Sequence, residues 1–322
     1  MSENVLRIRD LSVNYQTDRG VLEAIRHVNL DIPKGSIVGV VGESGCGKST
    51  LITSIIRQLD DNADILNGSI EFEKQDLLKL SLDKMRNISG TKLSIIFQDP
   101  MSTLNPVLSI GRQMIDIQYR DKISKKRKKQ RSIDMLTKVG IPDPRNQLNQ
   151  YPYELSGGMQ QRVSIAMALQ AGPSLLIADE PTTALDTTLE VQILKLLKEL
   201  QEEMGCSILF VSHHLGVIAE LCDHVVVMYA GEIVEQGSTY EIFNNPAHPY
   251  TVKLLECDPA SISKKQNLLP TIPGEIPDLI NLSGGCIFKN RCDQSIERCD
   301  KVTPILNKFD THHFVSCHLI ES

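Results

Sequence analysis

The sequence contains no apolar run long enough to cross a lipid bilayer. Its longest apolar stretches, such as residues 175–178 and 225–229, fall far short of the roughly 20 residues that a membrane-spanning helix needs. Residues 1–10 also lack the apolar core of a secretory signal peptide. We therefore expect the chain to be made and kept in the cytosol, with any membrane role depending on partner proteins.

An excess of positive charge is missing as well. The formal net charge of −6 argues against a nucleic-acid partner, because proteins that bind nucleic acid usually present a basic face. Residues 122–131, KISKKRKKQR, are a local exception, and runs of this kind usually form the solvated face of a helix. We expect no nucleic acid among the partners.

Short apolar segments alternate with helical patterns through much of the chain. Apolar runs typical of buried parallel strands occupy residues 93–97, 175–178, 207–211 and 225–228. A helix between residues 189 and 204 has its apolar stripe at Val191, Leu194, Leu197 and Leu200. Strands that alternate with helices predict an α/β fold with a mostly parallel sheet covered on both sides.

Departures from this alternation predict the domain organisation. Residues 5–8, 28–32 and 37–41 alternate in the manner of strands. Residues 99–171 instead have helical periodicity and indicate a helical insertion in the α/β core. Beyond residue 250 the chain becomes rich in proline and then in cysteine. We expect a large domain over residues 1–250 and a small C-terminal Cys-rich domain over residues 251–322, because a chain of 322 residues suits two or three domains.

The strongest local motif is a G-x-x-x-x-G-K-S loop at residues 42–49, between a predicted strand and a predicted helix. Its glycines let several backbone N–H groups point into one concavity, where the helix N-terminus adds positive potential. Lys48 would reach the β- and γ-phosphates of a nucleotide, and Ser49 would offer a hydroxyl to Mg²⁺. The residues expected to contact the nucleotide here are Gly42, Glu43, Ser44, Gly45, Cys46, Gly47, Lys48, Ser49 and Thr50.

Two carboxylates follow the buried strand at residues 175–178, at the end where α/β sheets present ligands. Asp179 would help to hold Mg²⁺, directly or through water. Glu180 would polarise the water that attacks the γ-phosphate. An apolar strand that ends in Asp-Glu is common, but together with the phosphate loop it indicates hydrolysis of a nucleoside triphosphate.

The segment LSGGMQQR at residues 155–162 resembles the signature sequence of ABC ATPases, and other residues match that family's motifs in the same order. Tyr15 resembles the aromatic residue that stacks on adenine, and Gln98 resembles the glutamine that reaches Mg²⁺ and the attacking water. Asp186 ends a D-loop, Ala184-Leu185-Asp186, and His213 resembles the switch histidine that contacts the γ-phosphate.

This resemblance implies a RecA-like phosphate-loop core with an antiparallel β subdomain and a helical insertion, using ATP and Mg²⁺. The implied catalytic residues are Glu180, His213 and Gln98, and the implied Mg²⁺ ligands are Ser49, Gln98 and Asp179. Ser156, Gly157 and Gly158 would bind the γ-phosphate of ATP held by an opposite subunit, so two cassettes would close around two nucleotides before hydrolysis.

A closer resemblance, to the ATP-binding subunits of dipeptide, oligopeptide and nickel permeases, covers almost the whole chain. The segments that carry it are residues 97–106, 179–186, 245–251 and 269–274. It implies an ATPase at the cytoplasmic face of the membrane that powers import of short peptides. The implied partners are a second homologous ATPase, usually a different one, two membrane permease subunits and an extracytoplasmic binding protein. Met159 stands where the general signature has Gln, and His214 stands where Asp usually follows the switch histidine.

Four of the eight cysteines cluster near the end of the chain, at Cys286, Cys292, Cys299 and Cys317. Four thiolates can hold zinc or an iron–sulfur cluster, and unrelated buried cysteines are a third interpretation. The peptide-permease ATPases carry a similar pattern, matched by Gly285-Cys286, Arg291-Cys292, Cys299 and Cys317-His318. That resemblance favours a [4Fe–4S] cluster, with zinc second, which would act as a structural staple for a segment with little core.

Other functions stay open on the residues alone. The chain could belong to an importer of nickel or another small solute. It could also be a soluble ABC ATPase in DNA repair or translation, although such proteins usually carry two cassettes, coiled coils or inserted zinc modules, which this sequence lacks. A third hypothesis is a redox regulator that works through its C-terminal cysteines.

Overall fold

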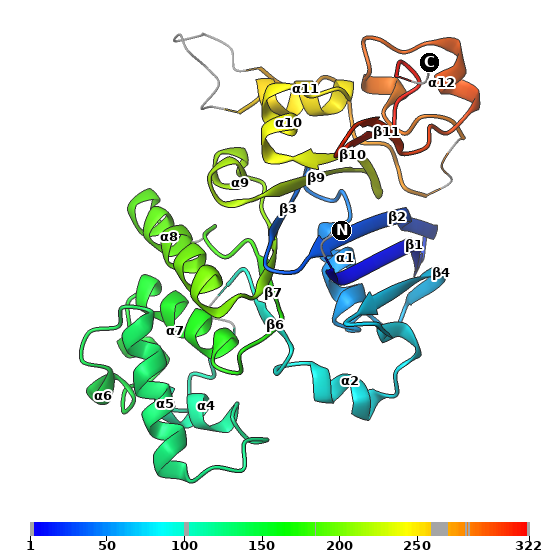
Figure 1. Ribbon diagram of the computed structural model, residues 1–322. Helices are drawn as coiled ribbons and strands as arrows, with labels where there is room; N and C mark the ends of the chain where they lie inside the picture. Colours follow the sequence, from blue (N-terminus) through cyan, green and yellow to red (C-terminus); the bar gives the residue numbers. More distant parts are fainter. Residues whose placement is uncertain are drawn as a thin grey trace. The chain divides into compact units, whose positions relative to one another are not determined.

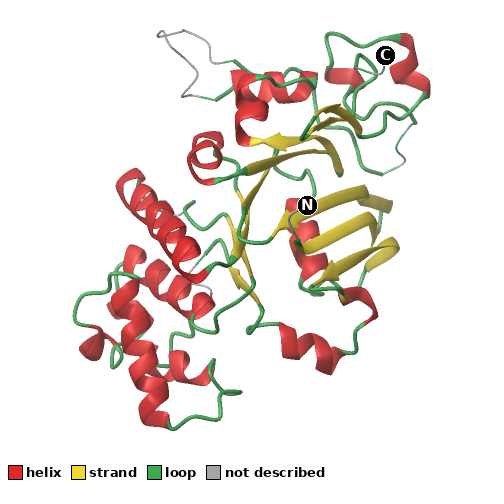
Figure 2. Cartoon of the chain, viewed as in Figure 1, coloured by secondary structure: helices red, strands yellow, loops and turns green. Residues whose placement is uncertain are grey.

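The computed structural model describes residues 3–99, 103–183, 185–258, 270–280, 282 and 284–320 (Figures 1 and 2). Contacts within it divide the chain into two compact units. The first unit combines Met1–Lys79 with Phe210–Ser322, and the second is Leu80–Leu209. The chain passes between the units at two points, and the strand β8 (Ser207–Val211) contains the second of them.

The first unit contains the antiparallel sheet that the family resemblance implies. Its strands, in the order in which they pair, are β2 (Gly20–Pro33), β1 (Asn4–Thr17), β4 (Ala63–Phe72) and β5 (Gln75–Asp76) (Figure 1). β1 and β2 are far longer than the strands predicted at residues 5–8 and 28–32. A register shift between Ile8 and Leu11, and positive φ angles of 50° at both Asp10 and His27, break the alternation on which that prediction relied.

A second sheet of the first unit joins the strand before the phosphate loop to the C-terminal segment. The strands of this sheet that lie wholly in the first unit are, in spatial order, β11 (Asn307–Asp310), β12 (His313–Val315), β10 (Glu232–Ser238), β9 (His224–Tyr229) and β3 (Ile37–Val41). β3 and β9 pair in parallel, and β10 pairs antiparallel with both β9 and β12. The expectation of a separate C-terminal Cys-rich domain is therefore wrong in one respect, because β12 extends a sheet of the core and the segment belongs to the same compact unit.

The helices of the first unit are short. They are α1 (Lys48–Ile55), η1 (Leu77–Lys79), α9 (Leu215–Leu221), α10 (Thr239–Asn244), α11 (Pro249–Glu256), η4 (Lys289–Arg291) and α12 (Glu297–Lys301). α10 begins with a capping box, in which Ser238 and Glu241 satisfy each other's backbone N–H groups.

The second unit is mainly helical. Its parallel strands are β6 (Leu93–Ile96) and β7 (Leu175–Asp179). Its helices are α2 (Leu82–Ile88), α4 (Ile110–Asp116), α5 (Lys125–Lys138), α6 (Pro144–Gln147), η2 (Pro152–Glu154), α7 (Gly157–Leu169) and α8 (Thr187–Met204). Between β6 and β7 the described residues form helices and turns but no strand.

The helix α8 buries an apolar stripe close to the predicted one. Leu194, Leu197 and Leu200 are buried as expected, together with Ile193 and Leu196. Val191 was assigned to the stripe but is 50% exposed, because the buried face is rotated toward Ile193. Among the described residues, no helix has both the length and the apolar character needed to cross a bilayer.

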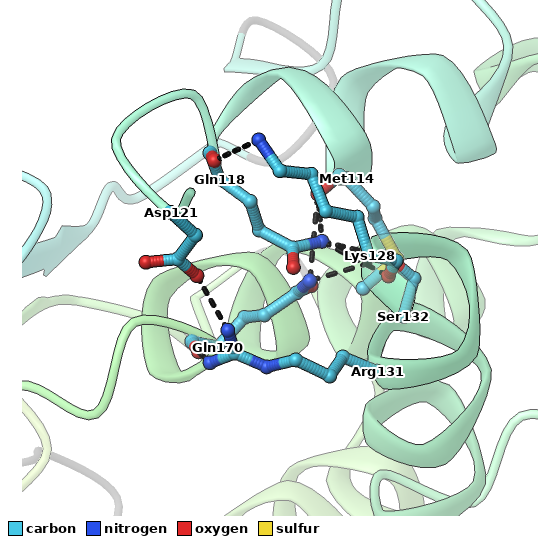
Figure 3. A network of polar contacts seen from close by, with 7 residues as sticks. All are labelled: Met114, Gln118, Asp121, Lys128, Arg131, Ser132 and Gln170. Carbon is cyan, nitrogen blue, oxygen red and sulfur yellow. Dashed lines mark hydrogen bonds and ion pairs between the residues drawn. The ribbon is translucent and has the colours of Figure 1, made fainter. Parts of the chain in front are cut away.

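A buried polar network joins α4, α5 and the end of α7 (Figure 3). The Ser132 hydroxyl accepts hydrogen bonds from the side-chain amides of Gln118 and Gln170, each at 3.2 Å. Two members of the basic run at residues 122–131 also belong to it: Lys128 donates to the Gln118 carbonyl at 2.5 Å, and Arg131 pairs with Asp121. The other basic side chains of the run are exposed, in agreement with the predicted solvated helix face: Lys122, Lys125, Lys126, Arg127 and Lys129.

Candidate nucleotide site and cysteine cluster

The phosphate loop lies between β3 and α1, as predicted, and its glycines are required by close contacts. Gly42 has φ 154°, and a Cβ there would lie 2.1 Å from the Met228 carbonyl oxygen. Gly47 has φ 104°, and a Cβ there would lie 2.8 Å from the Ala24 carbonyl oxygen. Because no side chain fits at either position, the loop can fold tightly against the backbone around it.

Lys48 is buried at the start of α1, and its ammonium group is held by the loop itself. Its Nζ donates to the carbonyl oxygens of Gly42 at 2.7 Å and Glu43 at 3.1 Å. The thiol of Cys46 is buried 3.6 Å from the same ammonium group, and burial raises its pKa. Ser44, Gly45 and Ser49 are exposed, and Thr50 is half-buried. The cationic end of Lys48 is therefore fixed at the concave side of the loop.

Tyr15 and His213, two other predicted site residues, also lie in the first unit. Tyr15 is half-buried on β1, opposite Leu22 of β2. His213 is exposed just before α9, and its ring centroid lies 4.3 Å from that of His214. His214 occupies the N-cap of α9 but its side chain makes no capping hydrogen bond. The departure from Asp at this position thus removes a helix cap that Asp would supply.

The predicted catalytic carboxylate and the Q-loop glutamine meet in the second unit. β6 and β7 are adjacent and parallel, so the residues after them, Gln98 and Glu180, emerge at one edge. The Gln98 side-chain amide donates to Glu180 Oε2 at 3.0 Å, and the Thr183 hydroxyl donates to the same oxygen at 3.1 Å. Glu180 has φ 44°, a conformation that glutamate rarely adopts, and Asp179 is half-buried beside it. Strained backbone of this kind is concentrated at functional sites.

The signature and D-loop residues begin two helices of the second unit. Ser156 is the N-cap of α7, where its hydroxyl accepts from the Met159 N–H at 3.3 Å. Asp186 is the N-cap of α8, where its carboxylate accepts from the Leu189 N–H at 3.0 Å. Both side chains are exposed, so each has a local structural role in addition to the predicted one.

Gly157 and Gly158 differ in what surrounds them. Gly157 is exposed and a Cβ there would meet nothing within 4 Å. Gly158 is buried, and a Cβ there would lie 3.0 Å from Leu189 Cδ1. Close packing against α8 therefore explains Gly158, whereas the local packing gives no reason for Gly157. Of the family segments, residues 100–102, 184 and 269 lie outside the described residues.

The four C-terminal cysteines line one small cavity. The other residues lining it are His248, Pro249, Phe288, Gln294, His318 and Leu319. Gly285, with φ 97°, allows the turn into Cys286, since a Cβ there would lie 2.3 Å from the Cys299 carbonyl oxygen. Burial raises the pKa of the Cys286 thiol to about 12 and also raises those of Cys292 and Cys317. A bound metal would have to reverse these shifts, because a coordinating thiol is deprotonated.

A single-ion site is not formed, however. Over the described part of the chain, no three or more His, Cys, Asp or Glu side chains are placed to hold one metal ion. The geometry of the described residues therefore supports neither the favoured [4Fe–4S] cluster nor zinc. Zinc would need its four ligands within ~2.3 Å of one point.

Comparison with known proteins identifies the class of protein first. Residues 25–183 match the ABC transporter family. A dimeric ATP-binding cassette in a post-hydrolysis state, bound to ADP and Pi, is similar with a TM-score of 0.65 and 28% identity over 73% of this chain and 98% of its own. The CbiO1 protein of Clostridium perfringens, part of an ABC transporter complex, is similar with a TM-score of 0.65 and 29% identity. The match covers 79% of this chain and 96% of CbiO1. The fold is that of an ABC nucleotide-binding domain, and the protein is an ABC-type ATPase.

The more specific assignment comes from relatives that match along the whole chain. The dipeptide transport ATP-binding protein DppD of Bacillus subtilis is 45% identical over 98% of this chain and 95% of its own length. The oligopeptide transport ATP-binding protein OppD of the same organism is 44% identical over 98% of this chain and 89% of its own length. Residues 234–299 match the oligopeptide/dipeptide transporter C-terminal region. The chain belongs to the family of ATP-binding subunits of peptide ABC transporters.

Sequence reasoning missed one part of the candidate site. Glu43 of the phosphate loop binds Tyr250 and Arg291, two residues more than 200 positions away in the sequence. Both occur in segments that resemble the family, but neither has a spacing relative to Glu43 that a single sequence could reveal. Only the fold brings these residues together.

Proposed function

We propose that the chain hydrolyses ATP to power import of dipeptides or oligopeptides, as the nucleotide-binding subunit of an ABC importer. The observation that carries this proposal is the end-to-end similarity to peptide-transport subunits, which includes the C-terminal region specific to such transporters. The division of residues 1–250 and 251–322 is then functional: the first part holds the ATPase motifs, and the second is an accessory segment.

The proposed roles follow the chemistry of each side chain. Lys48 binds the β- and γ-phosphates, while Ser49, Gln98 and Asp179 serve Mg²⁺. Glu180 orients the attacking water, and the hydrogen bond from Gln98 supports its carboxylate group. His213 contacts the γ-phosphate, Tyr15 stacks on adenine, and Asp186 supports the opposing cassette.

The proposed partners are those of a peptide importer. A second homologous ATPase, different from this chain, forms the closed dimer with it. The nucleotide bound by this partner ATPase is contacted by Ser156, Gly157 and Gly158 of the present chain. Two permease subunits in the membrane and an extracytoplasmic binding protein complete the complex, which places this chain at the cytoplasmic face.

Reconstitution into liposomes tests the proposal. The chain would be purified with the permeases and the binding protein encoded beside it, and ATP-dependent uptake of labelled dipeptides and pentapeptides would be measured. Uptake of either peptide is expected. Uptake of nickel or another small solute without any peptide uptake would assign the chain to the neighbouring class of importers.

The four cysteines are proposed to hold a [4Fe–4S] cluster. In support, they line one cavity and provide an all-sulfur ligand set, which suits iron–sulfur clusters. The cluster, when bound, supplies cross-links that stabilise the C-terminal segment.

Iron and acid-labile sulfide are measured after anaerobic purification, with Cys299→Ser compared with Cys206→Ser. Cys299 lines the cavity, whereas Cys206 is a buried cysteine outside it. We expect the wild type and Cys206→Ser to contain iron and sulfide. Cys299→Ser should lose both, together with part of its thermal stability. Iron-free wild-type protein would reject the cluster.

A further inference from the structure

Arg291 connects the cysteine segment to the phosphate loop within the first unit. Its guanidinium group binds both carboxylate oxygens of Glu43, with Nη1–Oε2 at 2.7 Å and Nη2–Oε1 at 3.1 Å. The Arg291 side chain is only 4% exposed, and that of Glu43 is 26% exposed. A two-pronged pair of this kind fixes direction as well as distance, because the planar guanidinium matches the carboxylate.

The remaining donors of Arg291 are also bound, which fixes its orientation. Nε donates to the Pro273 carbonyl at 3.0 Å, and Nη2 donates to the Ile272 carbonyl at 3.1 Å. Nη1 also donates to the Tyr229 hydroxyl at 3.3 Å. The guanidinium group therefore offers Glu43 a rigid support rather than a mobile surface charge.

A second contact holds the backbone of the same loop residue. The Glu43 N–H donates to the Tyr250 hydroxyl at 3.0 Å. Tyr250 is fully buried, and its ring centroid lies 4.6 Å from that of Tyr229 and 5.4 Å from that of Phe288. Glu43 is thus held through its side chain by Arg291 and through its backbone by Tyr250.

Glu43 in turn helps to shape the part of the loop that faces phosphate. Its carbonyl oxygen accepts from Lys48 Nζ at 3.1 Å and from the Cys46 N–H at 3.2 Å. The glycines on either side, Gly42 and Gly45, both have positive φ, so the loop has little stiffness of its own. Ties to a rigid neighbour lower the entropy that such a loop loses when it binds a ligand.

We propose that Arg291 is a positioning residue for the nucleotide: by clamping Glu43 together with Tyr250, it holds the phosphate loop in its binding conformation. Nucleotide affinity then depends on the fold of the C-terminal cysteine segment, in which Arg291 directly precedes Cys292. This inference rests on the phosphate-binding role of the loop and is independent of the transported cargo.

Titration of the purified chain with fluorescent ATP and ADP analogues tests the clamp. Arg291→Gln is expected to weaken binding of both nucleotides about tenfold, the effect of losing a charge-assisted contact. Arg291→Lys keeps the positive charge but lacks the planar guanidinium group. Its nucleotide affinity is expected to lie between those of the wild type and Arg291→Gln. Glu43→Gln should weaken binding as well, and the double variant Glu43→Gln/Arg291→Gln should be less impaired than the sum of the single variants.

Lys253→Gln is the matched control. Lys253 binds Asp293 at 2.9 Å and so anchors the same segment without touching the phosphate loop. Its loss should lower thermal stability while nucleotide affinity stays at the wild-type value. If Arg291→Gln folds poorly, Arg291→Lys and Glu43→Gln still decide the question.

Unchanged affinity in the Arg291 and Glu43 variants, or an equal loss in Lys253→Gln, would overturn the proposal. Failure of the wild-type chain to bind either analogue would instead reject the premise that the loop binds nucleotide, which is a different result.

Discussion

Glu180 combines the proposed catalytic carboxylate with a backbone conformation that is unfavourable for its residue type. A φ of 44° costs a residue with a Cβ about 1–2 kcal/mol relative to ordinary backbone. The conformation directs the side chain toward Gln98, whose amide reaches it at 3.0 Å. Backbone strain at this position lowers the stability of the fold, and it is the cost of holding the carboxylate group where the proposed reaction needs it.

Glu180→Gln should retain ATP binding and lose turnover. The amide keeps the shape of the side chain but cannot polarise water as a carboxylate does, so we expect kcat to fall at least ~100-fold. Steady-state ATPase assays and nucleotide titration on the assembled complex would measure the two effects. Glu199→Gln, an exposed carboxylate on α8, should retain full turnover. Near wild-type hydrolysis by Glu180→Gln would remove Glu180 from its proposed role.

The backbone strain can be measured separately with two variants that both lack the carboxylate. Glu180→Gly should have a free energy of unfolding about 1 kcal/mol higher than Glu180→Ala, because glycine adopts positive φ freely and alanine does not. Urea denaturation of the two variants gives this difference, and neither should hydrolyse ATP. Equal stability would show that the loop relaxes once the side chain is removed.

At the scale of single elements, the two helix caps combine structural and proposed functional roles. Asp186 begins α8, so Asp186→Ala should lower the free energy of unfolding by about 1 kcal/mol through loss of the cap. Asp186→Asn keeps an oxygen acceptor and should keep stability. If the D-loop role needs the charge, both variants will lose ATPase activity. An active Asp186→Asn would show that the cap alone explains this residue.

The network in Figure 3 fixes α4, α5 and the end of α7 to one another. The Ser132 side chain is completely buried and serves as acceptor for both Gln118 and Gln170. Ser132→Ala should therefore cost about 1–2 kcal/mol, because two buried amide donors each lose an acceptor. Thr137→Ala is the control, since Thr137 is exposed on the same helix and bonds only the Ile133 carbonyl. Urea denaturation that finds equal effects in the two variants would contradict the importance of the network.

The elements that the sequence predicted well are those whose signal is local. The phosphate loop follows β3 and opens α1 because glycine spacing and an apolar strand are both visible in a short window. β1 and β2 were predicted far too short, since bulged residues such as Asp10 and His27 interrupt the alternation. β12 carried no signal, because a strand of 3 residues is too short for periodicity to show. The contact of Arg291 with Glu43 spans 248 positions and depends on tertiary structure alone.

For the whole molecule, the most informative feature is that the cysteine segment belongs to the unit that carries the phosphate loop. The sequence predicts a small appended domain, because the composition changes after residue 250. Composition could not show that β12 pairs with β10 or that Glu235, fully buried, binds His313 of β12 at 2.6 Å. The accessory segment is therefore tied by strand pairing and a buried contact to the unit that carries the phosphate loop.

The proposed pairing of two cassettes predicts a difference between two serines that cap helices in the same way. Ser156 accepts from Met159 N–H and Ser124 accepts from Arg127 N–H, each at 3.3 Å, and both side chains are exposed. Arginine at either position loses about 1 kcal/mol of capping. Only at Ser156 would the arginine also place a bulky side chain where the triphosphate bound by the partner ATPase is expected.

We therefore expect Ser156→Arg, and not Ser124→Arg, to abolish ATP-dependent association with the partner ATPase in the Glu180→Gln background, as measured by light scattering. Both variants should bind the ATP analogue normally, because the phosphate loop is unchanged. Association that survives Ser156→Arg would mean that the signature does not face the nucleotide of a second subunit, and the two-cassette mechanism would have to be abandoned.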